Sequence, residues 1–351
     1  MNVADFDFEL PAERIAQYPA SRRDESRLLV LDRETGALRH RRFSDLAELL
    51  RPGDLLVLND TRVIPARLVG RKPSGGRVEL LLVEPVEPGA SGGVWRCLLK
   101  ASRPPAPGSS IDFGEGCSAR VLERDPIGWR VQLKVPGGRP EEWLDRIGQA
   151  PLPPYIRRNA AGPEAADRER YQTVFAQKAG AIAAPTAGLH FTEELLERLR
   201  DGGIAHTFLT LHVGPGTFRP VTAERVEDHR MHPERFELPA ETARAVAAAR
   251  SRAGRVVAVG TTVVRTLESC AVEEGRVSPG RERSSIFIYP GFRFRVVDAL
   301  ITNFHLPRST LLMLVSAFAG RERVLAAYRQ AIEAGYRFYS YGDAMLIEGG
   351  T

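Results

Sequence analysis

Residues 255–270, RVVAVGTTVVRTLESC, decide the fold class, because an apolar strand runs through one glycine directly into a helix. The strand RVVAVG occupies residues 255–260, and the helix TTVVRTLESC begins at residue 261. Another helix, ETARAVAAAR (241–250), precedes this strand. The order of helix, strand and helix is typical of an α/β domain whose mostly parallel sheet is covered by helices.

Segments on the N-terminal side of this stretch repeat the pattern. The helix TEELLERLR (192–200), with Thr192 as its N-cap, precedes the strand IAHTFLTLHV (204–213). Near the beginning of the chain, LLVLD (28–32) and DLLVLND (54–60) are apolar runs of strand length. Strands of this kind are expected in a sheet that is buried on both faces.

The segment between these α/β parts differs, because short strand-like runs follow one another without a strong helical period. These runs are RVELLLVE (77–84), WRCLLK (95–100), CSARVLER (117–124) and GWRVQLKV (128–135), separated by Gly, Pro and Ser. Such spacing is typical of a small antiparallel barrel. We therefore predict an inserted antiparallel β-barrel domain over residues 65–150. Residues 1–64 and 151–351 are expected to form the larger α/β domain, with a mostly parallel sheet.

Composition places the chain among ordinary globular enzymes, since 43% of its 351 residues are apolar and 26% are charged. Its three cysteines, Cys97, Cys117 and Cys270, form no C-x-x-C pair, which argues against a disulfide framework or a structural zinc site. The N-terminal residues MNVADFDFELP lack the layout of a signal peptide, and no apolar run is long enough to span a bilayer. We expect a cytoplasmic protein. The net charge of +5 favours a polyanionic partner only weakly.

Three loops each place a histidine within a few residues of Thr or Asn and of Gly or Pro. They are APTAGLHF (184–191), LHVGPGTF (211–218) and TNFHLP (302–307). Glycine allows backbone N–H groups to approach a ligand closely, and histidine titrates near neutral pH. Because each loop lies beside an apolar segment, we expect the three loops to converge on one pocket at the edge of a sheet.

Two further motifs have competing interpretations. In VVAVGTT (256–262), the helix N-terminus offers N–H groups to a polar or anionic ligand, or Gly260 only makes a tight turn. His229 and His232, with Glu227 or Glu234, raise the question of a metal site, but the sequence does not define the position of a third ligand. A loop with hydrogen-bonded histidines explains this pair better, so no metal site is expected.

Together these motifs resemble the S-adenosylmethionine:tRNA ribosyltransferase-isomerase family of queuosine biosynthesis. The resemblance is collinear and spans nearly the whole chain. It rests on LLVLNDTRVIPARL (55–68), PLPPYIRR (151–158), ERYQTVFA (169–176), AAPTAGLHFT (183–192), LTLHVGPGTFRPV (209–221), EDHRMHPERFEL (227–238), VVAVGTTVVRTLES (256–269), ITNFHLPRSTLLMLVSAFAG (301–320) and YGDAMLI (341–347). Departures are mild: Pro215 lies inside the glycine turn, and Arg308 stands where lysine is often expected.

The resemblance implies a reaction in which the ribose of S-adenosylmethionine is the carbon donor. The ribosyl group is transferred to 7-aminomethyl-7-deazaguanine at the tRNA wobble position and isomerised, which gives epoxyqueuosine and releases adenine and methionine. S-adenosylmethionine is thus a consumed substrate, and neither a metal nor a redox cofactor is implied. The expected partner is the anticodon stem-loop of tRNA, and the protein is expected to act as a monomer.

Within this resemblance we assign three groups of site residues. His190 and His305 are the acid–base candidates, with Asp60 and Glu268 as orienting residues or alternatives. Substrate binding is assigned to Thr186, Gly188, His212, Gly214, Gly216, Thr217, Gly260, Thr261, Thr262, Arg265 and Asn303. Contacts with tRNA are assigned to the basic residues Arg62, Arg67, Lys100, Arg103, Arg157 and Arg158.

Two other functions remain as alternatives. A non-catalytic tRNA-binding module would use the barrel as a nucleic-acid platform and would turn over no substrate. An S-adenosylmethionine-dependent RNA methyltransferase would produce methylated RNA and S-adenosylhomocysteine. The products therefore distinguish all three functions.

Overall fold

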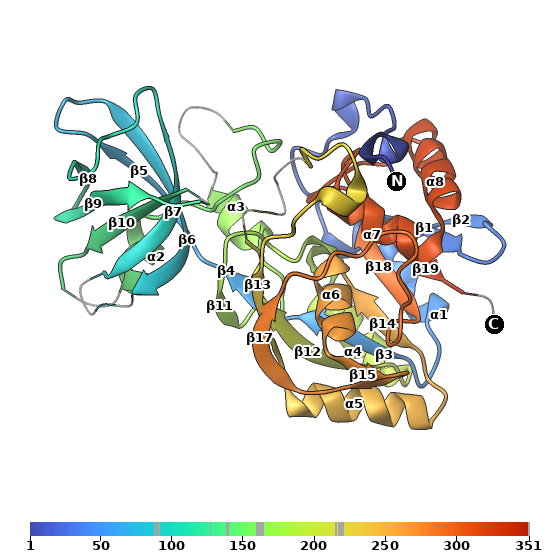
Figure 1. The fold of residues 1–351 in the computed structure, drawn as a ribbon. Helices are drawn as coiled ribbons and strands as arrows, with labels where there is room; N and C mark the ends of the chain where they lie inside the picture. Colours follow the sequence, from blue (N-terminus) through green and yellow to red (C-terminus); the bar gives the residue numbers. More distant parts are fainter. Residues whose placement is uncertain are drawn as a thin grey trace.

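The computed structural model of the chain shows a barrel beside a larger α/β domain, and both ends of the chain lie on the larger domain (Figure 1). The structure describes residues 1–87, 89, 92–126, 128–137, 140–158, 165–214, 216 and 221–349. None of the helices in these ranges has both the length and the hydrophobicity that crossing a bilayer requires.

The larger domain is built on a nine-stranded sheet with the order β17-β13-β12-β3-β14-β18-β19-β1-β2. Its strands are β1 (Arg27–Asp32), β2 (Leu38–Arg42), β3 (Leu55–Asn59), β12 (Ala205–Leu211), β13 (Glu234–Leu238), β14 (Val256–Val259), β17 (Gly280–Ser284), β18 (Ala299–Asn303) and β19 (Ala344–Glu348). The neighbours β12, β3, β14 and β18 are parallel to one another. Their carboxyl ends therefore lie at one edge of the sheet.

The sheet is mixed, whereas the sequence predicted a mostly parallel one. The pairs β17–β13, β13–β12, β18–β19 and β1–β2 are antiparallel. Antiparallel neighbours can be joined without a crossover helix, and β1 and β2 form such a hairpin. At its turn, Asp32 accepts hydrogen bonds from the N–H groups of Glu34 and Thr35. Because four of the five residues of β2 are exposed, this strand has no apolar run that the sequence could reveal.

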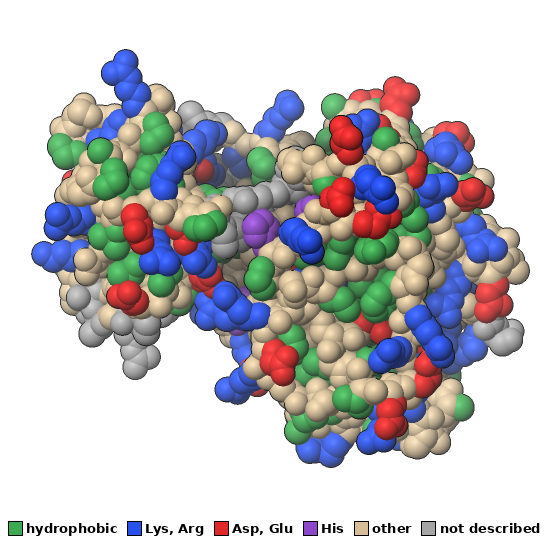
Figure 2. All heavy atoms as spheres, viewed as in Figure 1, with side chains coloured by type: hydrophobic (Ala, Val, Ile, Leu, Met, Phe, Trp, Pro, Cys, Tyr) green, Lys and Arg blue, Asp and Glu red, His purple; other side chains and the backbone are tan. Residues whose placement is uncertain are grey.

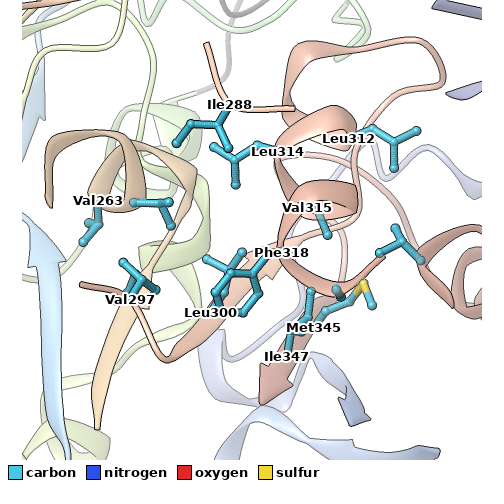
Figure 3. Packing of buried hydrophobic residues seen from close by; sticks show 14 of the residues in the cluster. Val263, Ile288, Val297, Leu300, Leu312, Leu314, Val315, Phe318, Met345 and Ile347 are labelled. Atoms are coloured by element: carbon cyan, nitrogen blue, oxygen red, sulfur yellow. The ribbon is translucent and has the colours of Figure 1, made fainter. Parts of the chain in front are cut away.

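Helices cover both faces of the sheet, which explains why its central strands are apolar throughout. Leu55 and Val57 of β3 pack with the helices of one face, and Leu56 and Leu58 pack with those of the other. Figure 3 shows part of the first core, where α6 and α7 pack on β18 and β19. The helices are α1 (Leu46–Leu49), α2 (Pro140–Ile147), α3 (Ala165–Arg170), α4 (Glu193–Asp201), α5 (Ala240–Ser251), α6 (Thr261–Ser269), α7 (Thr310–Ala319) and α8 (Arg321–Glu333). Thr192 caps α4, as predicted, by accepting a hydrogen bond from Leu195 N.

The smaller body is a closed antiparallel barrel with the strand order β10-β7-β6-β5-β8-β9. Its strands are β5 (Arg67–Arg71), β6 (Arg77–Glu87), β7 (Val94–Ala101), β8 (Ser110–Gly114), β9 (Cys117–Arg124) and β10 (Trp129–Lys134). Alternate residues point inward, and Trp143 and Leu144 of α2 add to the same core. The predicted class, an α/β domain that carries an inserted antiparallel barrel, is confirmed.

A short parallel pair joins the barrel to the larger domain. Strand β4 (Thr61–Val63) continues from β3 toward the barrel, and β11 (Lys178–Ala181) pairs with it on the return. The side chain of Gln172 bonds the backbone N–H and C=O of Val63 at 3.0 and 2.7 Å. The barrel therefore attaches at the carboxyl end of a central strand. A further antiparallel pair, β15 (Ala271–Glu273) and β16 (Arg276–Val277), follows α6.

Candidate active site

Polar segments follow each of the four parallel strands at the edge where their carboxyl ends meet. His212 follows β12, Asp60 follows β3, and Gly260 joins β14 to α6. Asn303 is the last residue of β18, and His305 comes two residues later. Ligands in α/β sheets bind at this edge, because loops and helix N-termini converge there.

A cavity of about 650 Å³ lies between this edge and the barrel. Arg62 and His212 line it from the larger domain, and Val83 and Trp95 line it from the barrel. In the space-filling view, a hollow separates the two bodies, with histidine side chains visible inside and Lys and Arg side chains around it (Figure 2). We call this space the larger cavity.

A second cavity of about 80 Å³ adjoins the first, since Val213 and Leu311 line both. It lies among the ends of β14 and β18, the N-termini of α6 and α7, and the rings of Tyr155 and Tyr339. These rings are stacked, with centroids 4.4 Å apart. We call this space the smaller cavity.

The predicted substrate-binding residues divide between the two cavities. His212, Gly214, Gly216 and Arg265 line the larger cavity, and Thr186, Gly260, Thr261, Thr262 and Asn303 line the smaller one. Gly188 lines neither of them. A Cβ there would come within 2.9 Å of the side chains of Phe175 and Thr173, so this glycine is explained by close packing. Thr217 lies outside the described residues.

His190 is buried behind the smaller cavity, and both of its ring nitrogens are hydrogen-bonded. Ser26 Oγ donates to the carbonyl oxygen of Arg23, so it accepts the hydrogen of His190 Nδ1 at 2.7 Å. His190 Nε2 in turn accepts from the amide of Asn303 at 3.1 Å. Burial, together with Arg337 and Arg23, lowers the pKa of this imidazole to about 3. The geometry gives His190 a positioning function toward Asn303, because neither nitrogen is free to move a proton of the substrate.

His305 is also buried, but it lines the smaller cavity directly. Its Nε2 lies 3.4 Å from Thr302 Oγ1, while its Nδ1 has no hydrogen-bond partner among the described residues. Burial lowers the pKa of its ring to about 3. His305 is therefore neutral at physiological pH and presents a polar atom to a ligand in this cavity.

The two candidate carboxylates are held by the protein itself. Glu268 accepts hydrogen bonds from the backbone N–H groups of Arg295, Val296 and Val297 at 2.9 to 3.1 Å, which fixes the segment before β18. Asp60 accepts from Thr210 Oγ1 at 2.6 Å. Burial raises the pKa of both carboxyl groups. Neither residue lines one of the two cavities, so an orienting function fits them better than direct proton transfer.

His212 has the arrangement of a neutral general base. Thr61 Oγ1 lies 3.5 Å from the carbonyl oxygen of Lys178 and 2.8 Å from His212 Nδ1, and a hydroxyl that donates to this carbonyl accepts the hydrogen of Nδ1. Nε2 then carries the lone pair, and it has no partner among the described residues. Burial, with Arg235 and Lys178 nearby, lowers the pKa of the ring, so it is unprotonated at neutral pH. The larger cavity thus contains an oriented imidazole with one free acceptor.

Glu234, which the sequence suggested only as a possible metal ligand, is part of the candidate site. It is buried at the start of β13 and forms an ion pair with Arg265 of α6. Its other oxygen accepts a hydrogen bond from Gly214 N at 2.7 Å. Glu234 therefore ties the loop after β12 to α6, and both ends of this bridge line the larger cavity. The sequence contained no local signal for this bridge, because its three residues belong to separate elements.

A second carboxylate connects the two bodies across the larger cavity. Glu84 of β6 forms ion pairs with Arg235 of β13 and Arg283 of β17, as well as with Arg96 inside the barrel. Glu84, Arg235 and Arg283 all line the cavity. The barrel is thus held against the larger domain by charged groups that are open to a ligand.

The basic residues assigned to tRNA have different surroundings. Arg62, Lys100, Arg103 and Arg157 are exposed, and Arg62 lines the larger cavity. Arg67 pairs with Glu79 on the neighbouring barrel strand at 2.9 Å, with about a quarter of its side chain exposed. Four of the six cations are therefore directly accessible to a phosphate.

Arg158 differs from these because its guanidinium is buried. It forms two hydrogen bonds with Asp167, of 2.8 and 2.7 Å, and lies over the ring of Tyr18. Only 5% of its side chain is exposed. Arg158 is thus committed to an internal ion pair, and its assignment as a phosphate contact is not supported by this geometry.

His229 and His232 lie in the loop that lines one side of the larger cavity. The ring of His229 packs edge-on against Phe287, with centroids 5.2 Å apart, and His232 lies close to Gly216. Within the described part of the chain, no three His, Cys, Asp or Glu side chains are grouped so that they could hold a metal ion.

Comparisons with known proteins agree with this architecture. A family model described as queuosine biosynthesis protein matches residues 3–347. The S-adenosylmethionine:tRNA ribosyltransferase-isomerases of Pelobacter propionicus and Trichlorobacter lovleyi are 59% and 56% identical to the chain, over 99% of the chain and 100% of each relative. The crystal structure of the S-adenosylmethionine tRNA ribosyltransferase of Thermotoga maritima is similar, with a TM-score of 0.55 and 40% identity, over 98% of this chain and 99% of that one.

These matches extend across both bodies of the structure and include all four segments at the sheet edge. The relatives so named are enzymes of the transferase class. The chain belongs to the queuosine biosynthesis protein family.

Proposed function

We propose that this protein transfers the ribosyl group of S-adenosylmethionine to 7-aminomethyl-7-deazaguanine at the wobble position of tRNA and isomerises it. The products are epoxyqueuosine-containing tRNA, adenine and methionine. Family membership supports the reaction class. One structural observation carries the assignment to a site: the carboxyl ends of four parallel strands lie at two adjoining cavities, and the larger cavity lies against the barrel.

The two cavities suit a donor with two chemically different ends. The larger cavity has room for the nucleoside of the donor and for a base of the tRNA, and it faces the exposed arginines. The smaller cavity lies at the N-terminus of α6. The backbone N–H groups of Thr261 and Thr262 suit the methionine carboxylate, because the first N–H groups of a helix lack intrahelical partners.

His212 is the general base in this proposal. The sulfonium of the donor acidifies the hydrogens on the 5′ carbon, and Nε2 of His212 takes one of them. The amine of the tRNA base bonds to the 1′ carbon as the bond to adenine breaks. The bond between the 1′ carbon and the ring oxygen then breaks as the 5′ carbon bonds to the 1′ carbon, which closes the cyclopentane. The freed oxygen, still on the 4′ carbon, bonds to the 5′ carbon and displaces methionine, which forms the epoxide. Of the two protons removed from the 5′ carbon and the amine, one goes to the departing adenine and the other to solvent. Thr61 contributes by fixing the hydrogen of His212 on Nδ1.

The exposed cations hold the tRNA in this proposal. Arg62 lies at the larger cavity itself, whereas Lys100 and Arg103 extend along the barrel and Arg157 lies on the larger domain. Lys and Arg side chains surround the hollow in Figure 2. Such contacts fix the register of a nucleic acid without reading its sequence. The chemistry requires no resident metal or redox cofactor, because the donor supplies its own leaving groups.

Mass spectrometry of the reaction products tests the proposal. The purified protein is incubated with S-adenosylmethionine and a tRNA that carries 7-aminomethyl-7-deazaguanine. The expected result is epoxyqueuosine in the digested tRNA, with adenine and methionine released in equal amounts. Methylated tRNA with S-adenosylhomocysteine would identify a methyltransferase. Binding of tRNA without any product would identify a binding module.

A further inference from the structure

Three polar atoms in the lining of the smaller cavity have no hydrogen-bond partner among the described residues. They are Asn303 Oδ1, His305 Nδ1 and the hydroxyl oxygen of Tyr339. Their residues are 2%, 8% and 6% exposed, so bulk water does not satisfy these atoms. Buried polar groups in proteins are almost always hydrogen-bonded. Three unsatisfied atoms in one cavity therefore indicate a ligand with several donors.

The orientation of Asn303 is fixed by its neighbours, which makes its free atom an acceptor. Its Nδ2 donates to Tyr339 O at 3.3 Å and to His190 Nε2 at 3.1 Å. His190 can accept there because its hydrogen is on Nδ1, facing Ser26. Both amide hydrogens are thus used, and Oδ1, in a residue that lines the cavity, is left without a partner among the described residues. His190 is a positioning residue for this oxygen.

The other two free atoms can accept as well. His305 is neutral, and with its hydrogen on Nε2 toward Thr302 its Nδ1 carries a lone pair. A tyrosine hydroxyl accepts as readily as it donates. Tyr339 has a φ of 71°, a conformation that non-glycine residues rarely adopt and that is found preferentially at ligand-binding sites. Three neutral acceptors in one place match the three donors of an ammonium group.

The same cavity also offers groups that can bind an anion. Its lining includes the N-termini of α6, at Gly260–Thr262, and of α7, at Ser309 and Leu311. These helices are nine and ten residues long, and the N-terminus of a helix carries partial positive charge. No Asp, Glu, Lys or Arg belongs to the lining. The cavity therefore offers acceptors for a cation and N–H groups for an anion, without a formal charge of its own.

We propose that the smaller cavity binds the α-amino-acid end of S-adenosylmethionine as a zwitterion. The ammonium donates to Asn303 Oδ1, Tyr339 Oη and His305 Nδ1, and the carboxylate accepts from the first N–H groups of α6. This inference rests on the proposed function, because it identifies the part of the donor that enters this space. The volume of about 80 Å³ corresponds to roughly six water-sized groups, enough for an amino-acid end and not for a whole nucleoside. The sulfonium then lies near Val213 and Leu311, with the ribose in the larger cavity.

The test compares two ligands and two variants by calorimetry. The ligands are S-adenosylmethionine and its desamino analogue, in which hydrogen replaces the α-amino group. The variants are Tyr339→Phe, which removes one proposed acceptor, and Tyr171→Phe as the matched control. Tyr171 is also a buried tyrosine, but it does not line the cavity.

We expect the unmodified protein to bind S-adenosylmethionine about ten- to a hundredfold more tightly than the desamino analogue, because hydrogen bonds to a charged group are strong. Tyr339→Phe should weaken binding of S-adenosylmethionine about tenfold and leave the analogue unchanged. Tyr171→Phe should change neither affinity. Equal affinity of the unmodified protein for the two ligands would overturn the inference, as would a Tyr339→Phe variant that weakens both ligands equally.

Product analysis separates this inference from the proposed function. If epoxyqueuosine forms but the amino group does not affect affinity, only the zwitterion site is wrong. If affinity depends on the amino group as expected but the products are those of a methyltransferase, the proposed reaction is wrong and the site remains.

Discussion

The larger cavity and a polar layer near the smaller cavity contain the same kinds of side chain. They differ in whether the hydrogen-bonding atoms of these side chains already have partners within the protein. The polar layer consists of Ser26, His190, Arg158, Asp167 and Tyr341. Its members bond one another or the backbone: Ser26 to His190, Arg158 to Asp167, and the Tyr341 hydroxyl to Asp167 at 3.0 Å. Ser26, His190 and Tyr341 leave only about 20 Å³ of space between them and their neighbours.

In the larger cavity, by contrast, two polar side chains keep atoms that can bind a ligand. His212 is fixed through Nδ1 by Thr61, and its Nε2 has no partner among the described residues. The exposed Arg62 likewise lines this space. Residue type therefore does not decide whether a side chain can act on a ligand. A side chain can do so only where its neighbours leave one of its hydrogen-bonding atoms unused.

The strongest test of this comparison is His212→Gln. Glutamine keeps a hydrogen-bonding side chain but cannot act as a base at neutral pH. Because positioned general bases contribute about 10²- to 10⁴-fold, turnover should fall by about this factor while the affinity for S-adenosylmethionine changes little. The measurement is single-turnover formation of the modified tRNA, together with exchange of the 5′ hydrogens of the donor with solvent.

His206→Gln is the matched control for this variant. His206 lies on the same strand, β12, and packs against Phe208 rather than lining either cavity. Its replacement should leave turnover unchanged. If the His212→Gln variant exchanges the 5′ hydrogens as fast as the unmodified protein does, another residue is the general base.

Arg158→Ala should have the largest effect in the polar layer, on stability rather than on chemistry. It removes the guanidinium from the buried carboxylate of Asp167, and breaking a buried ion pair costs about 3–5 kcal/mol. The free energy of unfolding in urea measures this loss. Arg157→Ala, at the neighbouring exposed position, should change it by less than about 0.5 kcal/mol. Equal losses of unfolding free energy for the two substitutions would contradict the distinction between the hydrogen-bonded polar layer and the exposed position of Arg157.

The pH dependence of stability provides a third test. His190 has a folded-state pKa of about 3, below its ordinary value of 6.5, so protons favour the unfolded chain. Its contribution is complete above pH 6.5 and is lost as the pH falls from 6.5 toward 3. At pH 5 it should have lost about 2 kcal/mol. In His190→Leu, the decrease in unfolding free energy between pH 7 and pH 5 should be smaller by this amount. An unchanged slope would show that His190 is not buried in its neutral form.

The fold was predictable where its signals are local. The alternating residues of Cys117–Arg124 mark β9, and the apolar run at residues 54–60 marks β3, because strand patterning is visible within a few residues. The antiparallel pairing of β2 in the large sheet could not be predicted from the sequence, since β2 is a polar edge strand. Pairing at such an edge depends on its neighbour and not on its own pattern.

The site divides in the same way. The positions of Asn303 and His212 at strand ends predicted that both residues line a cavity. The function of each histidine could not be predicted in this way, because the hydrogen-bond partner of His190 Nδ1 is Ser26, which is 164 positions away in the sequence. The free hydroxyl of Tyr339 was equally hidden, since only the folded chain shows that nothing bonds it.

The smallest expected effect concerns Arg157, and it extends the comparison to the tRNA. The side chain of Arg157 is exposed, whereas that of the adjacent Arg158 is 5% exposed and paired. Each lost phosphate contact lowers the slope of log affinity against log salt by roughly one. Arg157→Ala should therefore weaken tRNA binding severalfold at low salt and reduce this slope, without changing the affinity for S-adenosylmethionine.

Arg158→Lys, which keeps a positive charge beside the buried Asp167, should leave the slope unchanged. Filter binding over a range of salt concentrations measures both slopes. If Arg157→Ala keeps the full slope, the phosphate lies elsewhere, and Lys100 and Arg103 of the barrel become the next residues to replace.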